Sequence, residues 1–122
     1  MYIDIQEPYR IEYYSTRRVE KPAEEYLHAM KPRHVAKALR WLDMLEQLGP
    51  ALGRPYADLL DSPVRELRPS MEGHQHRFLY VIHARTILMT NAFLKKSARV
   101  PESEIALAMR RYADWLGHRE NS

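Results

Sequence analysis

The chain has no cysteine among its 122 residues, which excludes disulfide bonds and thiolate catalysis. A chain without thiols is compatible with a reducing compartment, so we expect a cytoplasmic protein. No apolar run approaches the roughly 20 residues that span a bilayer, and no membrane contact is expected. The N-terminal residues MYIDIQEPYR lack a basic segment followed by an apolar core, so they are unlike a signal peptide.

Metal-binding patterns are scarce as well. The six histidines include no HxxxH pair, and without cysteine the usual zinc spacings cannot occur. The spacing His74-x-His76 on a strand chelates a metal only weakly, so we expect neither a metal nor another cofactor. Eight prolines against four glycines indicate defined turns rather than disorder.

The chain does have enough apolar material for one core, because hydrophobic residues make up 45% of it. Charged residues make up 29%, which is ordinary for a soluble protein. At this length we expect a single domain over residues 1–122.

Positive charge is concentrated in residues 64–100, which we call the basic segment. It holds seven lysines and arginines against two acids, a local charge of +5, whereas the whole chain carries +3. Several strand-like stretches of this segment carry basic side chains, and neighbouring strands bring such side chains to one face. The pattern therefore predicts a surface for a phosphate chain. The alternative is that charge on exposed strands only prevents pairing between sheet edges.

Hydrophobic periodicity predicts an α+β fold with the order β-α-α-β-β-β-α. Strands are predicted at 10–15, 63–68, 76–83 and 87–94, and helices at 22–30, at 32–48 and from 101 to about 116. Short connections predict a mainly antiparallel, twisted sheet, with a helical hairpin on one face and a C-terminal helix. Residues 50–62 are expected to be a connecting loop. The apolar stripe of the second helix is predicted to be Val35, Ala38, Leu39, Leu42, Leu45 and Leu48.

This order resembles the RelE/ParE toxin superfamily of bacterial toxin–antitoxin systems, and most of all its HigB or phage Gp49-like branch. The likeness covers roughly residues 10–116. It is carried by VRELR at 64–68, RFLY at 77–80, AFLKKS at 92–97, and the proline and EI pair at 101 and 104–105. His76 departs from the pattern, since an aromatic residue usually precedes the strand arginine in this branch.

The resemblance implies a small toxin of a type II system that a cognate antitoxin, of the helix-turn-helix kind, holds inactive. Operator DNA would then be contacted only through the antitoxin. RelE- and HigB-like members are ribosome-dependent mRNA endonucleases that need no metal, so ribosome and mRNA are the expected targets. ParE-like members share the fold but inhibit DNA gyrase without catalysis, which is one alternative. A non-catalytic nucleic-acid-binding phage or regulatory protein is another.

Metal-free RNA cleavage uses the 2′-hydroxyl of the substrate as nucleophile and passes through a dianionic phosphorane. It needs a proton acceptor, cations around the phosphate and a proton donor for the 5′-oxygen. Arg77 is the first candidate cation, because a guanidinium offers a planar fork to two phosphate oxygens and the branch has an arginine at this strand position. The alternative for Arg77 is an ion pair with Glu66 on the adjacent strand. Arg68 matches the arginine of the ELR strand, and its alternative is a pair with Glu66 or Glu72.

The remaining candidates follow from position. Lys95 and Lys96 match a lysine pair of the branch, and adjacent strand residues point to opposite faces, so at most one of them is expected beside Arg77. We assign Lys95 to catalysis and Lys96 to RNA contact. For proton transfer we predict His74, which titrates near neutrality and is expected to reach over from a turn, or Glu66. The other predicted RNA contacts are Arg65, His76 and Arg99, with His76 expected on the face opposite Arg77.

Overall fold

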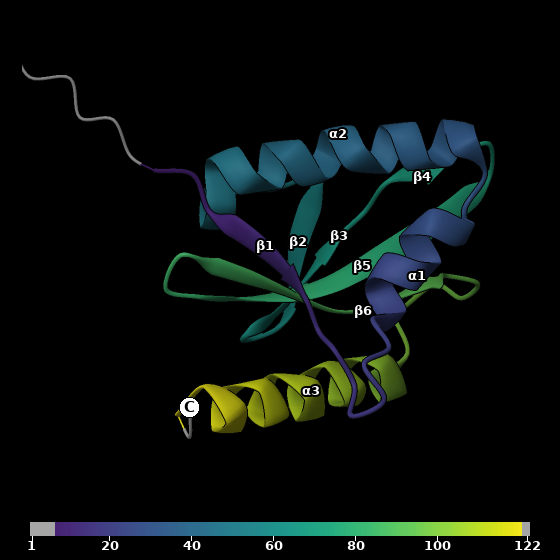
Figure 1. The fold of residues 1–122 in the computed structure, drawn as a ribbon. Helices are drawn as coiled ribbons and strands as arrows, with labels where there is room; N and C mark the ends of the chain where they lie inside the picture. Colours follow the sequence, from purple (N-terminus) through teal and green to yellow (C-terminus); the bar gives the residue numbers. More distant parts are fainter. Residues whose placement is uncertain (1–6, 121–122) are drawn as a thin grey trace, which may run out of the picture.

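The computed structural model describes residues 7–120, which form an α+β fold with helices on both sides of a sheet (Figure 1). The helices are α1 (Pro22–Ala29), α2 (Pro32–Leu48), a 3-10 turn η1 (Gly49–Ala51) and α3 (Glu102–Glu120). The strands are β1 (Arg10–Tyr13), β2 (Ala57–Asp61), β3 (Val64–Leu67), β4 (Ser70–Met71), β5 (His74–His83) and β6 (Thr86–Leu94). The predicted fold class is confirmed.

The sheet is mixed and mostly antiparallel. Its strand order is β1-β6-β5-β3-β2, and the short β4 pairs with β5 outside this path. Strands β5 and β6 are the long central pair, with β3 and β2 added antiparallel on one side. On the other side β1 pairs parallel with β6, from Arg10 opposite Thr86 to Tyr13 opposite Met89. The parallel pair was not predicted, because it joins segments far apart in the sequence.

Two short strands lie where the sequence predicted none. Residues 50–62 are not only a connector, since Ala57–Asp61 forms the edge strand β2 against β3. The nearby Gly53 and Pro55 favour a loop, and only the tertiary pairing with β3 overrides that preference. Ser70–Met71 forms β4, which turns back through Glu72 and Gly73 onto the start of β5. Both residues of that turn have positive φ, 52° for Glu72 and 80° for Gly73.

Each face of the sheet is covered by its own helices. Along β5, Phe78 and Tyr80 are fully buried in a core with α1 and α2, whereas Leu79 and Val81 pack in a second core under α3. This alternation is the one predicted from the sequence, because successive side chains of a strand point to opposite faces. Side chains of the basic segment are therefore divided between two differently covered faces.

The buried stripe of α2 differs from the prediction. Its buried residues are His34, Ala38, Leu42 and Leu45, while Leu39 is 50% exposed and Leu48 is 48% exposed. Residues four apart follow one face of a helix, so the row that starts at residue 34 faces the sheet. His34 was given no role in the sequence prediction, yet it opens this row.

Helix α3 is tied to the first strand by polar contacts. The hydroxyl of Tyr14 donates to Asp114 Oδ2 at 2.6 Å, and the indole N–H of Trp115 donates to the carboxylate of Glu12. Arg111 donates to the backbone oxygen of Thr90 at 2.9 Å. These bonds fix the C-terminal half of α3 over the sheet. Within residues 7–120, none of the helices has the length and apolar character needed to cross a bilayer.

Candidate functional site

Charged side chains from several parts of the chain surround an open cavity of about 370 Å³ on the α3 face of the sheet. We call it the cationic cleft. Strand β3 supplies Glu66 and, just beyond its end, Arg68, while β5 supplies Arg77. Lys95 follows the end of β6, and Arg99 precedes α3. The other lining residues are Arg54, Asp58, Leu60, Ala98, Val100, Glu102 and Ile105.

The deepest pair in the cleft is Glu66 with Arg77. The Nε atom of Arg77 lies 3.0 Å from Glu66 Oε1, and the two side chains are only 3% and 9% exposed. The other guanidinium nitrogens of Arg77 donate to the backbone oxygen of His76, to Ser70 Oγ and to Gln75 Oε1, at 2.9, 3.3 and 3.1 Å. Both terminal nitrogens of the guanidinium are therefore hydrogen-bonded, whereas Nε faces Glu66 in a close ion pair without hydrogen-bond geometry, so Arg77 does not present an open fork.

Burial dominates the ionisation of this pair. It raises the pKa of Glu66, and the positive charges of Arg77 and Arg68 oppose that rise. Burial likewise lowers the pKa of Arg77, against the favourable field of Glu66. An arginine whose pKa falls somewhat from its very high normal value stays charged near neutral pH. The carboxylate of Glu66 is thus a stronger base than an exposed glutamate, yet it remains paired with a cation.

Three cations of the cleft are better placed to meet a ligand than Arg77 is. Arg68 is 27% exposed and its Nε lies 4.0 Å from Glu66 Oε2, at the limit of an ion pair. Lys95 is half-buried and Arg99 is exposed. Neither Lys95 nor Arg99 forms an ion pair with another residue of the described part of the chain.

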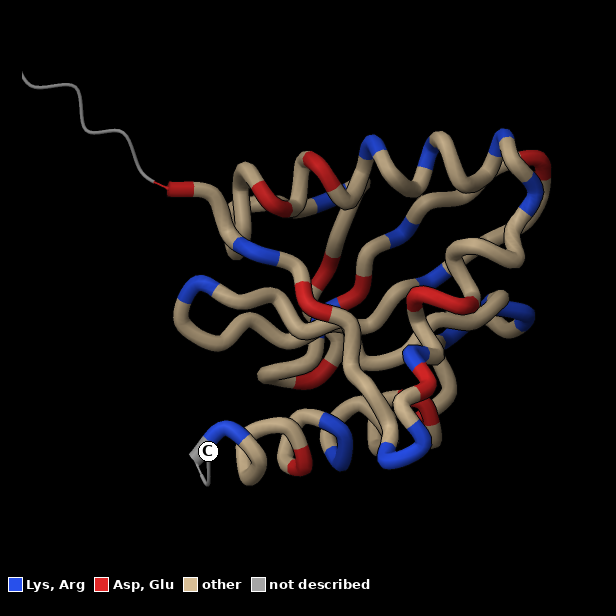
Figure 2. The backbone as a smooth tube through the Cα atoms, viewed as in Figure 1, with Lys and Arg blue, Asp and Glu red and all other residues tan. Residues whose placement is uncertain are grey.

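The cleft is not uniformly basic. In Figure 2 acidic segments lie among basic ones in the middle of the sheet, and the lining residues comprise five cations and three carboxylates. Arg54 is partly neutralised because it pairs with Asp58 at 2.7 Å. A basic carboxylate surrounded by cations is what proton abstraction from a hydroxyl beside a phosphate requires.

Five of the nine residues predicted for the site meet in this cleft, namely Glu66, Arg68, Arg77, Lys95 and Arg99. The lysine pair follows the end of β6, and of the two Lys95 lines the cavity whereas the exposed Lys96 does not. Arg65 falls between Val64 and Glu66 on β3, so its side chain points to the α1 and α2 face.

The two predicted histidines lie on the opposite side of the sheet from the cleft. His76 points away from Arg77, as expected, and its ring packs against Tyr26 and His34. His74 does not reach over the cleft; its ring stacks at 12° on His76 and meets His34 edge-on. We call Tyr26, His34, His74 and His76 the histidine cluster. Their positions exclude a shared site with Glu66, because β5 separates the two groups.

The histidine cluster borders a second cavity of about 290 Å³, whose other lining residues are Ala29, Met30, Lys31 and Leu94. Within residues 7–120 no group of three or more histidine, aspartate or glutamate side chains has a geometry that holds a metal ion. The pKa of His76 is lowered from 6.5 to about 4, first by burial and then by the charges of His34, His74 and Arg77. His76 is therefore neutral at physiological pH.

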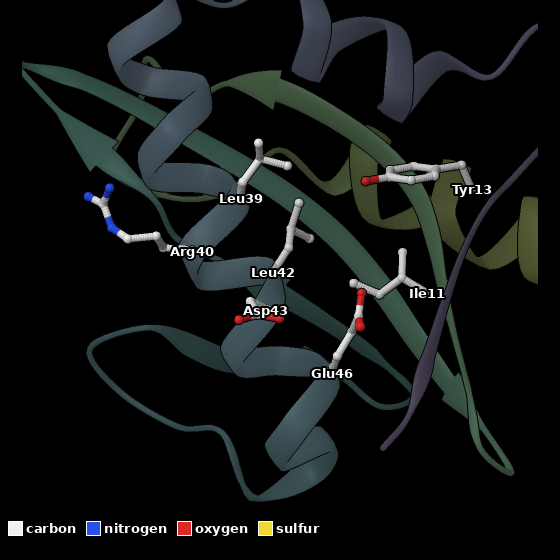
Figure 3. Close-up of a pocket in the computed structure, with 7 residues that line it drawn as sticks. All are labelled: Ile11, Tyr13, Leu39, Arg40, Leu42, Asp43 and Glu46. Carbon is white, nitrogen blue, oxygen red and sulfur yellow. The ribbon is translucent and has the colours of Figure 1, made fainter. Parts of the chain in front are cut away.

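A third hollow runs between α2 and β1, with a volume of about 470 Å³. Figure 3 shows Leu39 and Leu42 on its helix side and Ile11 and Tyr13 on its strand side. Its remaining lining residues are Arg40, Asp43 and Glu46. The pKa of Tyr13 is raised to about 12, mainly by burial and then by the acids Glu24 and Glu46. This groove offers apolar contact and fixed charges, but no arrangement for proton transfer.

Comparison with known families identifies a match over most of the chain. The model of the family described as phage derived protein Gp49-like (DUF891) matches residues 25–113, from the middle of α1 into α3, and so includes the cleft and the histidine cluster. None of the curated proteins matches the chain.

Proposed function

We propose the following function for this chain, which belongs to the phage-derived Gp49-like family because the family model spans most of it. The chain acts as the toxin of a type II toxin–antitoxin system and cleaves mRNA bound to the ribosome. This proposal makes it a metal-independent endoribonuclease of the RelE and HigB kind. Its active site is the cationic cleft.

One observation carries the proposal. Glu66 is a buried carboxylate with a raised pKa, held by Arg77 at the wall of an open cleft that Arg68, Lys95 and Arg99 also line. A structural ion pair alone does not require three further cations around an accessible cavity. Perturbed carboxylates in charged clefts are a feature of active sites.

The chemistry follows from the positions of the side chains. Glu66 accepts the proton of the 2′-hydroxyl, which then attacks the adjacent phosphorus. Arg68 and Arg99 balance the negative charge of the phosphorane, and Lys95 donates a proton to the departing 5′-oxygen. Arg77 is a positioning residue that fixes the carboxylate and keeps it ionised. The products are a 2′,3′-cyclic phosphate and a free 5′-hydroxyl.

A protein antitoxin is the proposed partner. Leu39 and Leu42 line the groove between α2 and β1, and Leu39 is half exposed. β1 also ends the sheet and leaves one backbone edge without a strand partner among residues 7–120. A groove with apolar side chains and fixed charges beside an open strand edge suits a partner segment that adds a strand and inserts apolar side chains between those charges.

The cellular test compares induction of the wild-type chain with induction of Glu66→Gln. Gln keeps the shape of Glu66 and an oxygen for Arg77, but it cannot serve as the proton acceptor. We expect wild type to stop growth and to create new mRNA 5′ ends in phase with codons. Glu66→Gln should reduce those ends by on the order of 10²-fold.

Arg110→Ala is the matched control, because Arg110 is exposed on α3 away from the cleft and should leave cleavage unchanged. Plasmid supercoiling is measured in the same cells. Lost supercoiling without new mRNA ends contradicts the proposal and indicates a gyrase inhibitor. Normal growth, with neither effect, indicates a binding protein without toxic activity.

A further inference from the structure

The cavity beside the histidine cluster has no part in the cleavage chemistry above, and its side chains form an ordered chain of hydrogen bonds. The hydroxyl of Tyr26 lies 2.7 Å from His76 Nδ1, and His76 Nε2 lies 2.8 Å from His34 Nδ1. Each of these nitrogens is used once, so the chain runs from Tyr26 through His76 to His34. Its last atom is His34 Nε2.

That last atom is buried and has no hydrogen-bond partner among residues 7–120. The His34 side chain is only 1% exposed, and the nearest opposite charge, Glu72 Oε1, is 3.7 Å away and itself pairs with Arg33 at 3.4 Å. Leaving a buried polar nitrogen unpaired is unfavourable. His34 is one of the residues that line the cavity, and its Nε2 is the atom of the hydrogen-bond chain that still lacks a partner.

The walls of the cavity select the kind of ligand. Tyr26 and His74 are half-buried rings, so part of their surface is open for stacking, and Ala29, Met30 and Leu94 supply apolar contact. A volume of about 290 Å³ lies just below the range of ligand cavities, which starts at about 300 Å³, so only a small ligand or one group of a larger ligand fits. A flat ring system with polar atoms on its edge matches these walls.

The electrostatics argue against a phosphate inside this cavity. The deep imidazole of His76 is neutral, since its pKa lies at about 4, and the carboxylate of Glu72 stands next to His34. An anion would meet the neutral imidazole of His76 and a nearby negative charge, with no lysine or arginine buried among the lining residues. Lys31 is exposed and lines the same cavity, so it can pair with a phosphate that stays in solvent.

We propose that this cavity binds a nucleobase, which stacks on Tyr26 and His74 and forms a hydrogen bond with His34 Nε2. Proteins that read single-stranded RNA hold unstacked bases in this way, between aromatic rings and polar edges. The base belongs to an RNA strand or to a free nucleotide, and the two sources share this chemistry. The choice of RNA as source rests on the proposed function, whereas base binding itself does not.

The position of the cavity fits a strand that also enters the cationic cleft. His76 and Arg77 are adjacent on β5 and face opposite sides, and Ser70 of β4 links them to α2. Its Oγ accepts from Arg77 at 3.3 Å, while its backbone oxygen accepts from Lys37 of α2. Both sites therefore lie at the same end of the sheet, where Figure 1 shows β4 beside the start of α2. RNA that passes round this end can place a phosphate in the cleft and a nearby base in the cavity.

The test is an NMR titration of the full-length, 15N-labelled chain, observed at its histidine ring nitrogens. The probes are the four nucleoside 5′-monophosphates and a short single-stranded oligoribonucleotide. We expect the His34 and His76 signals to shift on saturation. Ala29→Trp, at the exposed end of α1, places a large ring in the cavity while it replaces no member of the hydrogen-bond chain, and it should weaken binding about tenfold or more. Ala36→Trp, an exposed residue of α2 that does not line the cavity, is the matched control and should bind normally.

If the signals shift with both the monophosphates and the oligonucleotide, the cavity binds a nucleobase from either source. If they shift with the oligonucleotide alone, RNA is the source. Shifts with the monophosphates alone identify a free nucleotide. Absence of shifts with every probe, or shifts that survive Ala29→Trp, overturns the inference. Cleavage assays on the same variants keep the two proposals apart. Normal cleavage without base binding removes only this inference, and base binding without cleavage removes only the proposed nuclease.

Discussion

Titratable groups are buried on both faces of strand β5, but their surroundings differ. On the α3 face Glu66 and Arg77 face each other at 3.0 Å as a buried ion pair, and the cleft around them stays open. On the α1 and α2 face His76 loses its charge, since burial and its neighbours bring its pKa to about 4. One face is therefore suited to a phosphate and the other to a neutral ring.

The contrast also shows why nearness in sequence misleads within a strand. His76 and Arg77 share a peptide bond, yet their side chains lie in different cavities with different cores behind them. The partner of Arg77 is Glu66 on β3, where Glu66 pairs directly with Leu79 of β5. Pairing between neighbouring strands brings the residues of the cleft together, whereas the alternation of side chains along β5 sends His76 and Arg77 to different sites.

The largest expected effect on stability comes from removing the Glu66–Arg77 ion pair on the α3 face. Arg77→Ala leaves the buried Glu66 without its closest cation, so we expect the free energy of unfolding to fall by about 3–5 kcal/mol. Chemical denaturation measures it. The double variant Glu66→Leu with Arg77→Met replaces the pair with apolar groups of similar size and should regain most of this loss. A loss below about 1 kcal/mol for Arg77→Ala would show that the pair is not the main buried interaction of this face.

A second prediction separates chemistry from stability on the same face. Arg68 is 27% exposed and touches Glu66 only at 4.0 Å, so Arg68→Ala should change the free energy of unfolding by less than about 1 kcal/mol. Cleavage of ribosome-bound mRNA should nevertheless slow by about 10²-fold, because one phosphate-stabilising cation is gone. Arg110→Ala is the control for loss of one positive charge. Equal cleavage rates for Arg68→Ala and Arg110→Ala would count against the cleft.

The third prediction uses pH to tell the faces apart. His76 has a folded pKa of about 4 and an ordinary value of 6.5, so the unfolded chain binds more protons between these values. Stability should therefore rise with pH across that window, by about 3 kcal/mol. Glu66 has a raised pKa, so the stability linked to its ionisation is fully present below its ordinary value of 4.5 and is lost as pH rises through the folded value.

Removing each group should tilt the pH–stability curve in opposite directions. His76→Gln should flatten the rise between pH 4 and 6.5, and Glu66→Gln should flatten the fall above pH 4.5. Urea denaturation across this pH range gives both slopes. Two variants with the same change of slope would mean that the faces do not differ in the way described.

The smallest expected effect concerns the salt dependence of RNA binding. Each phosphate contact on single-stranded RNA contributes a slope of about 0.7 to the fall of log affinity with log salt. Replacing Lys95 and Arg99 together by glutamine should reduce the slope by roughly 1.4 units if each contacts one phosphate. Ala29→Trp should weaken binding through the lost base contact and leave this slope unchanged. If Ala29→Trp changes the salt slope, the cleft does not bind only phosphates of the RNA and the cavity does not bind only a base.

Local pattern predicted the long elements of this fold well, because hydrophobic alternation and proline at helix starts are local signals. It missed β2, since Gly53 and Pro55 look like a loop until β3 pairs with the following residues. It also missed the parallel pairing of β1 with β6, which depends on contacts between residues about 76 positions apart, such as Arg10 and Thr86. Such pairings are fixed by the tertiary fold, so no local window contains them.

The candidate site was predicted only in part, because some of its contacts are also fixed by the tertiary fold. Glu66, Arg68, Arg77 and Lys95 were chosen by charge and by resemblance, and the structure brings them together. The contacts of Arg77 with Ser70, Gln75 and Glu66 were not predicted, because these residues lie on three different strands, β4, β5 and β3. His34 was missed because the stripe of α2 was counted from Val35. A row of residues at 34, 38, 42 and 45 was the signal that placed it on the buried face.

The most direct test of the proposed chemistry is single-turnover cleavage of an mRNA on purified ribosomes, with its scissile nucleotide carrying either a 2′-hydroxyl or a 2′-deoxy sugar. We predict that wild-type protein cleaves only the hydroxyl form and leaves a 2′,3′-cyclic phosphate, and that Glu66→Gln cleaves it on the order of 10²-fold more slowly. Melting curves check that the variant is folded. Cleavage of the 2′-deoxy substrate, or a folded Glu66→Gln variant that cleaves at the wild-type rate, would contradict the assignment of the cationic cleft as the active site.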